Sequence, residues 1–130
     1  MNNETLIEEA KAARLKAYTP YSNFKVGAAL LTKDGRIFHG CNVENASYGL
    51  TLCAECALVG NLQMTGGGLL RAFYCVDGAG NVLMPCGRCR QLLLEHGGGD
   101  LLVDHHSGPV TLNTLLPDSF GPDDLDAGRL

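Results

Sequence analysis

Four of the six cysteines stand in two pairs, and each pair comes directly before an apolar run of helical length. The two stretches are "TLCAECALVG" (51–60) and "MPCGRCRQLLLEHG" (84–97). Residues three apart lie close together on one face of a helix, so Cys86 and Cys89 can converge on one point. Cys53 can join them only at the very start of its own helix. The spacing therefore predicts a site between two helix N-termini, which restricts how the chain can fold.

The chemistry of these thiols depends on where the protein is located. The first 18 residues mix acidic and basic side chains with the apolar ones, which is not the pattern of a secretory signal. No segment has the apolar length that crosses a bilayer. We therefore expect a cytoplasmic protein with no membrane partner. In a reducing compartment, a patterned set of cysteines favours metal binding or catalysis over disulfides.

The composition restricts the class of partner. A hydrophobic fraction of 45% and a charged fraction of 18% are typical of a folded globular chain. The formal net charge is -4 and there is no basic run, which argues against binding to nucleic acid. A neutral or mildly polar small molecule is the expected ligand.

The order of the apolar segments predicts one α/β domain over residues 1–130, with helices covering a mixed sheet. A first helix is expected to end before residue 19, with a capping box formed by Thr5 and Glu8. A hairpin follows, with Asp34-Gly35 as its turn signal. Further helices are expected from about residue 53 to the glycines at 66–68 and at 86–96, and strands at 69–77 and 100–104. The tail is expected to hold one brief helical turn before a Pro- and Asp-rich end.

The two helix starts suit a metal ion. Thiolates bind zinc, and the free N–H groups at a helix N-terminus stabilise their negative charge. Three thiolates leave the fourth tetrahedral position open, as in catalytic zinc sites, whereas structural sites usually have four protein ligands. A water molecule in an open position can be activated, and Glu55 is placed to move its protons. The backbone N–H of Ala54 would point toward a molecule lying over the metal.

Cys56 supports a different interpretation of the same motif. Together with Cys53, Cys86 and Cys89 it forms C-x-x-C…C-x-x-C, a spacing that indicates a closed structural zinc site. A structural site would give no role to Glu55. The cysteines alone leave both kinds of zinc site open.

The sequence around these cysteines resembles the zinc-dependent cytidine deaminases of the small homotetrameric type. The shared signature is a metal ligand two residues before a glutamate, followed later by Pro-Cys-x-x-Cys. The resemblance also covers "PYSNFKVGAAL", "GCNVENASYGLT", "MPCGRCRQ" and "LLPDSFGP", in the family's order. It implies a three-layer α/β/α cytidine deaminase-like fold with a mixed β-sheet. It also implies hydrolytic deamination of cytidine and 2′-deoxycytidine to the uridine compounds, with release of ammonia, in pyrimidine salvage.

The resemblance assigns the metal ligands and the catalytic residue. Cys53, Cys86 and Cys89 would hold one Zn²⁺ per chain, and Glu55 would transfer protons between water, the ring N3 and the departing amine. Many family members have arginine directly after this glutamate, where it can donate hydrogen bonds to the thiolates. Cys56 stands there in this chain, so part of the negative charge of the three thiolates would lack its usual partner.

The substrate contacts also follow from the resemblance. Phe24 would stack against the pyrimidine ring, Asn42 and Glu44 would hydrogen-bond the ribose 3′-hydroxyl, and Ala54 would contact the base through its backbone. Neighbouring subunits of a homotetramer would complete the site, and the positions that match this role are Ala46, Tyr48 and Phe120. A related deaminase of a modified cytosine nucleoside, such as blasticidin S, shares the zinc motif, but the ribose-binding "NVEN" favours cytidine.

The remaining cysteines and the histidines are given no chemical role by the sequence. Cys41 and Cys75 lie in expected strands, where a thiol usually serves as a small buried hydrophobic group. The four histidines have no partners at ligand spacing and are expected at the surface or at helix ends; they are His39, His96, His105 and His106.

Overall fold

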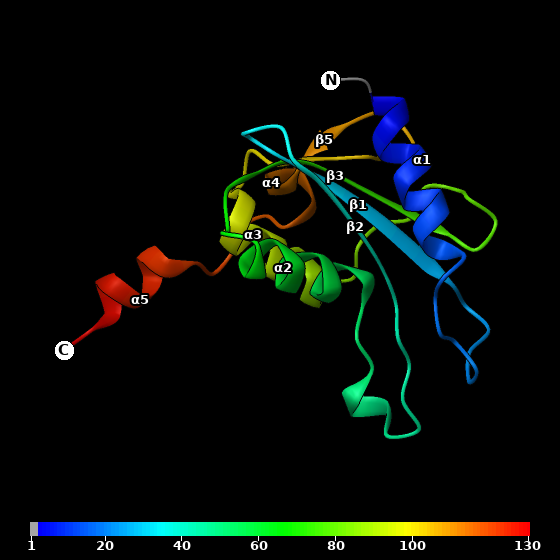
Figure 1. Cartoon of the computed structure of the whole chain (residues 1–130). Helices are drawn as coiled ribbons and strands as arrows, with labels where there is room; N and C mark the ends of the chain where they lie inside the picture. The colour runs from blue at the N-terminus through cyan, green and yellow to red at the C-terminus, as the bar shows by residue number, and fades with distance from the viewer. Residues whose placement is uncertain (1–2) are drawn as a thin grey trace.

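The computed structural model describes residues 3–130, which form a five-stranded sheet with helices on both faces (Figure 1). The strands are β1 (Val26–Thr32), β2 (Ile37–Cys41), β3 (Leu70–Asp77), β4 (Leu102–Val103) and β5 (Val110–Thr111). The helices are α1 (Asn3–Arg14), α2 (Ala54–Met64), α3 (Gly87–Gly97), α4 (Leu112–Leu115) and α5 (Pro122–Gly128), with a 3-10 turn η1 at Tyr48–Leu50. Among these described residues, no helix combines the length and the apolar character needed to cross a membrane.

The sheet is mixed, and its strand order is β2-β1-β3-β4-β5. Strands β3 and β4 run parallel, while the other neighbours are antiparallel. The β1–β2 hairpin turns at Gly35, whose φ of 92° lies in the left-handed region that glycine adopts without a steric penalty. The hairpin predicted from Asp34-Gly35 is therefore confirmed.

Two apolar cores separate the three layers. Successive side chains of a strand point to opposite faces of a sheet, so neighbouring residues of β1 and β3 belong to different cores. Ala28 and Leu30 pack with Leu58 and Leu62 of α2 and with Leu93 of α3. On the other face, the core under α1 contains Leu6, Ala10, Ala29, Leu31, Ala72, Tyr74 and Val76. The predicted α/β fold, a mixed sheet flanked by helices, is confirmed.

The two ends of the chain differ in part from the expectation. Thr5 lies inside α1, which begins at Asn3, so the capping box with Glu8 is wrong. The brief helical turn expected in the tail is present as α4, but α5 beyond it was not predicted. Its start signals are Pro122 at the first position and the Asp124 carboxylate, which accepts a hydrogen bond from the Gly121 N–H at 2.8 Å.

Candidate active site

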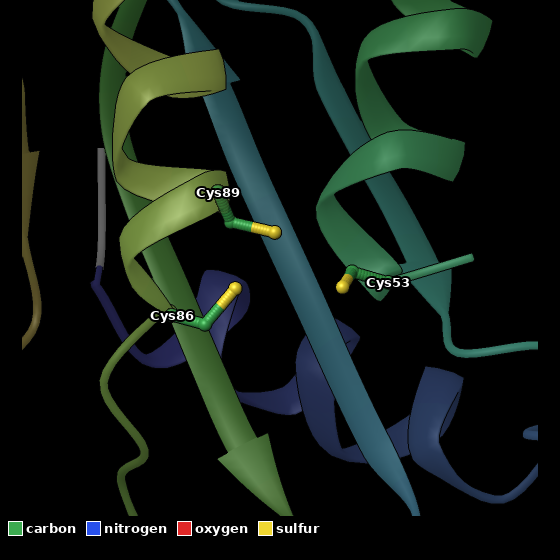
Figure 2. A group of neighbouring side chains, drawn as sticks. All are labelled: Cys53, Cys86 and Cys89. Atoms are coloured by element: carbon green, nitrogen blue, oxygen red, sulfur yellow. The ribbon is translucent and has the colours of Figure 1, made fainter. Parts of the chain in front are cut away.

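The N-termini of α2 and α3 meet on one face of the sheet (Figure 2). Cys53 is the N-cap of α2 and Cys86 is the N-cap of α3, and both have an extended backbone. The approach of α2 depends on Gly40 in β2, because a Cβ there would lie 2.8 Å from the Ala54 carbonyl oxygen. The structure thus brings together the two helix starts that the cysteine spacing predicts.

Three thiols converge between these helix starts. Figure 2 shows the side chains of Cys53, Cys86 and Cys89 directed toward one another, and their Sγ atoms all lie within 4.8 Å of each other. Tetrahedral zinc with Zn–S bonds of about 2.3 Å places two sulfurs roughly 3.8 Å apart, so the donor set and its spacing fit a zinc ion. Cys56 is outside this group and lines a separate cavity of about 390 Å³. The geometry thus supports three ligands and an open fourth position.

Burial and neighbouring groups set the acidity of these thiols. Burial raises the pKa of Cys53 and that of the fully buried Cys89. Burial also opposes ionisation of Cys86, but hydrogen bonding, first from the backbone N–H of Cys89, lowers the Cys86 pKa overall. Three closely spaced thiolates repel one another, so this arrangement favours a bound cation that offsets their charge.

Glu55 lies in the first turn of α2 and is almost completely buried, with 4% of its surface exposed. Burial raises the pKa of its carboxyl group. The buried thiol of Cys75, on β3, donates a hydrogen bond to Oε1 of Glu55 with a sulfur–oxygen distance of 3.7 Å. Burial and the neighbouring carboxylate also raise the pKa of Cys75, so its thiol keeps the proton that it donates. Cys75 was expected to be a simple core residue, and an apolar strand gives no signal of this contact.

Two cavities adjoin above these groups. The first, of about 180 Å³, is lined by two of the three clustered thiols, by Glu55 and by mostly apolar residues: Val26, Asn42, Thr51, Leu52, Cys53, Ala54, Glu55, Cys75, Leu83, Met84, Pro85 and Cys86. The second, of about 400 Å³, is lined by Tyr21, Ser22, Glu44, Asn45, Tyr48 and Thr51. Thr51 lines both cavities. The two cavities therefore adjoin at Thr51.

Ala54 and Asn42 line the first cavity. Ala54 is the first residue of α2, where a backbone N–H has no acceptor within the helix. The Asn42 side-chain amide holds the start of β1. Its Oδ1 accepts a hydrogen bond from the Val26 N–H at 3.0 Å, and its Nδ2 donates one to the Phe24 carbonyl at 2.9 Å. Phe24 lines neither cavity, and 52% of its surface is exposed.

The three residues expected to serve neighbouring subunits are exposed. Tyr48, on η1, lines the second cavity and packs edge-on against Tyr21 with ring centroids 6.1 Å apart. Ala46 and Phe120 line neither of these cavities. Figure 1 shows η1 at the end of a loop that extends away from the sheet, and α5, just after Phe120, standing apart from the rest of the chain. Within one chain, these residues are not gathered around the thiols.

Comparison with known proteins identifies the family. Residues 1–103 match the family model described as the cytidine and deoxycytidylate deaminase zinc-binding region. The chain belongs to the cytidine deaminase family. It is 65% identical over 120 residues to a cytidine deaminase of Mycobacterium tuberculosis, covering 92% of this chain and 90% of that protein. The family prediction is thereby confirmed.

Solved structures of cytidine deaminases have the same fold. The M. tuberculosis enzyme superimposes with a TM-score of 0.90 at 62% identity, covering 93% of this chain and 98% of the other. The cytidine deaminase of Mycobacterium leprae gives a TM-score of 0.88 at 58% identity, covering 91% of this chain and 99% of the other. The cysteine cluster thus lies in the zinc-binding region of this family.

In this cytidine deaminase, Arg90 anchors the loop that carries Cys86. Its Nε donates to the Pro85 carbonyl and its Nη1 donates to the Leu115 carbonyl, both at 2.8 Å. The guanidinium therefore ties the start of α3 to α4. Arg90 follows Cys89 directly, but the sequence does not indicate which carbonyls it would reach.

Proposed function

We propose that the protein catalyses the hydrolytic deamination of cytidine and 2′-deoxycytidine to uridine and 2′-deoxyuridine, with release of ammonia. The observation that carries this proposal is the convergence of three thiols beside a buried carboxylate that lines a cavity. The similar proteins of M. tuberculosis and M. leprae are named cytidine deaminases, which supports the same substrate here. The role in the cell would be pyrimidine salvage in the cytoplasm, where the six free cysteines stay reduced.

The metal ligands in this proposal are Cys53, Cys86 and Cys89. When bound, Zn²⁺ would supply Lewis-acid activation of a water molecule. The two helix N-termini stabilise the thiolates that hold the ion. The open side of the cluster is the side on which Ala54 and Glu55 line the cavity, so water and substrate would meet there.

Glu55 would carry the protons of the reaction. It takes one proton from the attacking water and delivers it to N3 of the ring, while the water oxygen forms a bond to C4. It then moves the second water proton to the exocyclic nitrogen, and the C4–N bond breaks to release ammonia. Each water proton is accounted for, one on N3 of uridine and one in ammonia. The position of this carboxylate, in the first turn of α2 and in the lining of the cavity, supports this role.

The substrate would lie across both cavities, with the base beside Glu55 in the smaller cavity and the ribose between Asn42 of the smaller cavity and Glu44 of the larger one. The backbone N–H of Ala54 would bind the base, and Asn42 and Glu44 would bind the ribose 3′-hydroxyl. Phe24 would stack on the pyrimidine ring. Contacts to the 3′-hydroxyl rather than the 2′-hydroxyl favour weak discrimination between cytidine and 2′-deoxycytidine.

Assembly into a homotetramer with shared active sites is part of the proposal. Exposed apolar side chains in contiguous patches favour association between subunits. Tyr48 and Phe120 expose 74% and 58% of their surfaces, and Ala46 lies on the same extended loop as Tyr48. These three residues would complete the site of a neighbouring subunit. The net charge of -4 argues against nucleic acid as a further partner.

Ammonia release from cytidine, measured on protein of known zinc content, tests the function. We expect turnover with about one zinc per chain, the stoichiometry of a single three-thiolate site. Glu55→Gln should retain zinc and lose turnover by at least about 100-fold, the scale of general acid–base catalysis. Cys56→Ala is the matched control and should keep zinc, since Cys56 lies outside the thiol cluster.

Three results would contradict the proposal. Full activity of Glu55→Gln would remove the proton-transfer role, and loss of zinc in Cys56→Ala would indicate a closed four-cysteine site. A zinc-loaded protein that is inert on cytidine and 2′-deoxycytidine but active on blasticidin S would identify a deaminase of modified nucleosides.

A further inference from the structure

Three donors from the turn at residues 19–24 reach the carboxylate of Glu44. Oε1 accepts hydrogen bonds from the backbone N–H groups of Tyr21 and Ser22, at 3.0 and 3.1 Å. Oε2 accepts a hydrogen bond from the Ser22 hydroxyl. An ionised carboxylate offers about four acceptor positions, two on each oxygen. Oε1 is therefore filled, and the acceptor position that is left belongs to Oε2, the atom that Ser22 holds.

The Ser22 hydroxyl can direct its hydrogen in only one way. Its Oγ accepts a hydrogen bond from the Phe24 N–H at 3.0 Å, and an ionised carboxylate has no hydrogen to donate. Ser22 must therefore donate to Glu44. Asn23 lies between Ser22 and Phe24 with a φ of 58°, a left-handed conformation that asparagine tolerates better than most residues. The result is a continuous chain from Phe24 through Ser22 to Glu44.

The charge of Glu44 agrees with this direction. The Ser22 hydroxyl, followed by the backbone N–H groups of Ser22 and Tyr21, lowers the pKa of the Glu44 carboxyl group. Glu44 is therefore an ionised acceptor at neutral pH. A substrate hydroxyl that binds to it must donate its hydrogen.

We propose that Ser22 is a positioning residue for recognition of the ribose 3′-hydroxyl, an inference that rests on the proposed function. Ser22 and Glu44 line the same cavity of about 400 Å³. Because one acceptor position of Oε2 is free, the Ser22 hydrogen bond sets the direction from which a substrate hydroxyl can approach that atom. The same hydroxyl accepts the Phe24 N–H, which fixes the direction in which its own hydrogen points.

The backbone around Ser22 is held by bonds that do not involve its hydroxyl. The Asn23 N–H donates to the Thr19 carbonyl at 3.0 Å, and the Glu44 N–H donates to the Tyr18 carbonyl at 2.8 Å. Removing the hydroxyl should therefore leave the turn folded. Without the hydroxyl, the Glu44 carboxylate could rotate, and the Phe24 N–H would donate its hydrogen bond to water.

The test compares Ser22→Ala, Ser22→Thr and the wild-type zinc enzyme on cytidine and on 2′,3′-dideoxycytidine, which has no 3′-hydroxyl. Ser22→Ala should lower kcat/KM for cytidine by about tenfold, the effect of losing one hydrogen bond to a charged group, with most of the change in KM. On 2′,3′-dideoxycytidine, kcat/KM of Ser22→Ala and of the wild type should differ by less than about twofold, because this substrate has no 3′-hydroxyl for Glu44 to bind. Ser22→Thr keeps a hydroxyl and should restore most of the loss.

A matched control and a second readout keep the test independent of folding. Ser107→Ala removes an exposed serine from the β4–β5 loop and should leave kcat/KM unchanged for both substrates. Inhibition by the products gives a binding measurement without turnover. Ser22→Ala should weaken inhibition by uridine by about tenfold and leave inhibition by 2′,3′-dideoxyuridine unchanged.

The outcomes separate this inference from the proposed function. Equal losses on cytidine and dideoxycytidine, or no loss on cytidine, would overturn the role of Ser22 while the deaminase activity stands. A wild-type protein that is inert on both nucleosides would overturn the proposed function and the inference with it.

Discussion

Cys75 shows how a core residue can take part in an active site. It lies in the middle of β3 with 2% of its surface exposed, and its thiol donates to Oε1 of Glu55. The side chain of Cys89 and the backbone N–H of Glu55 also hydrogen-bond this carboxylate. The Cys75 thiol is therefore one of several donors that limit the orientations of Glu55.

Replacing Cys75 should affect turnover more than zinc binding. Cys75→Ala removes the donor, and we expect kcat for cytidine to fall by about three- to tenfold, the range for one weak hydrogen bond, with zinc content unchanged. Cys75→Ser keeps a donor and should recover part of the loss. Cys41→Ala is the control, because Cys41 is a half-buried thiol that lines neither substrate cavity. Unchanged kcat in folded, zinc-loaded Cys75→Ala would show that this contact has no part in the reaction.

Residues could be predicted from the sequence where local spacing or a recognised motif carried the information. The spacing of Cys86 and Cys89 on one helical turn was enough to predict that they converge, and the structure confirms it. The contact between Cys75 and Glu55 could not be predicted, because it joins β3 to α2 and depends on register within the sheet. Ser22 lies within "PYSNFKVGAAL", but the sequence indicates no role for it, since its partner Glu44 is 22 residues away.

At the scale of elements, the site depends on how closely α2 approaches the sheet. Gly40 in β2 lies under the first turn of α2, where a Cβ would come within 2.8 Å of the Ala54 carbonyl and 3.2 Å of the Leu58 side chain. The same first turn carries Glu55, and Cys53 caps it. A side chain at residue 40 would therefore move a thiol and the carboxylate together.

Gly40→Ala should weaken zinc binding and the fold at the same time. The added methyl group meets backbone, which cannot rotate away, so we expect the free energy of unfolding to fall by about 1–3 kcal/mol, as in other overpacked cores. After dialysis against a chelator, Gly40→Ala should also retain less zinc than the wild type. Gly60→Ala is the matched control within α2, because a Cβ there meets open space, and it should raise the free energy of unfolding by about 0.4–1 kcal/mol. Wild-type zinc retention and melting temperature in Gly40→Ala would contradict this account.

The elements themselves were predictable to the extent that their signals are local. Helix α3 was expected at 86–96 and spans Gly87–Gly97, because Pro85 and the glycines after it mark both ends. The predicted start of α1 is wrong, since Thr5 and Glu8 fit a capping pattern that also occurs inside helices. Helix α5 was missed because its Pro- and Asp-rich sequence resembles a loop, although Pro122 marks its first turn.

At the scale of the whole molecule, one chain contains the thiols and Glu55 but leaves the side chains of Tyr48 and Phe120 exposed. Tyr48 and Phe120 lie on segments that extend from the body of the chain (Figure 1). The Phe120 carbonyl accepts a hydrogen bond from Nε2 of Gln91 on α3 at 2.7 Å, so the segment is tied to the chain while its ring stays exposed. In the proposed tetramer, such a ring reaches a neighbouring site.

Mixing one weakly active and one inactive variant tests whether active sites are shared. Phe120→Ala should lower activity by about tenfold or more, since loss of a buried interface aromatic has effects of this size, and Glu55→Gln should be inactive. A site in a random equal mixture works if its own chain has Glu55 and its neighbour has Phe120. With a chance of about one half for each, roughly one quarter of the sites in the symmetric oligomer should be active. Ammonia release after co-refolding should therefore rise to about a quarter of the wild-type rate per chain. Variants mixed without subunit exchange are the control, and activity no higher than their sum would mean that each site is built within one chain.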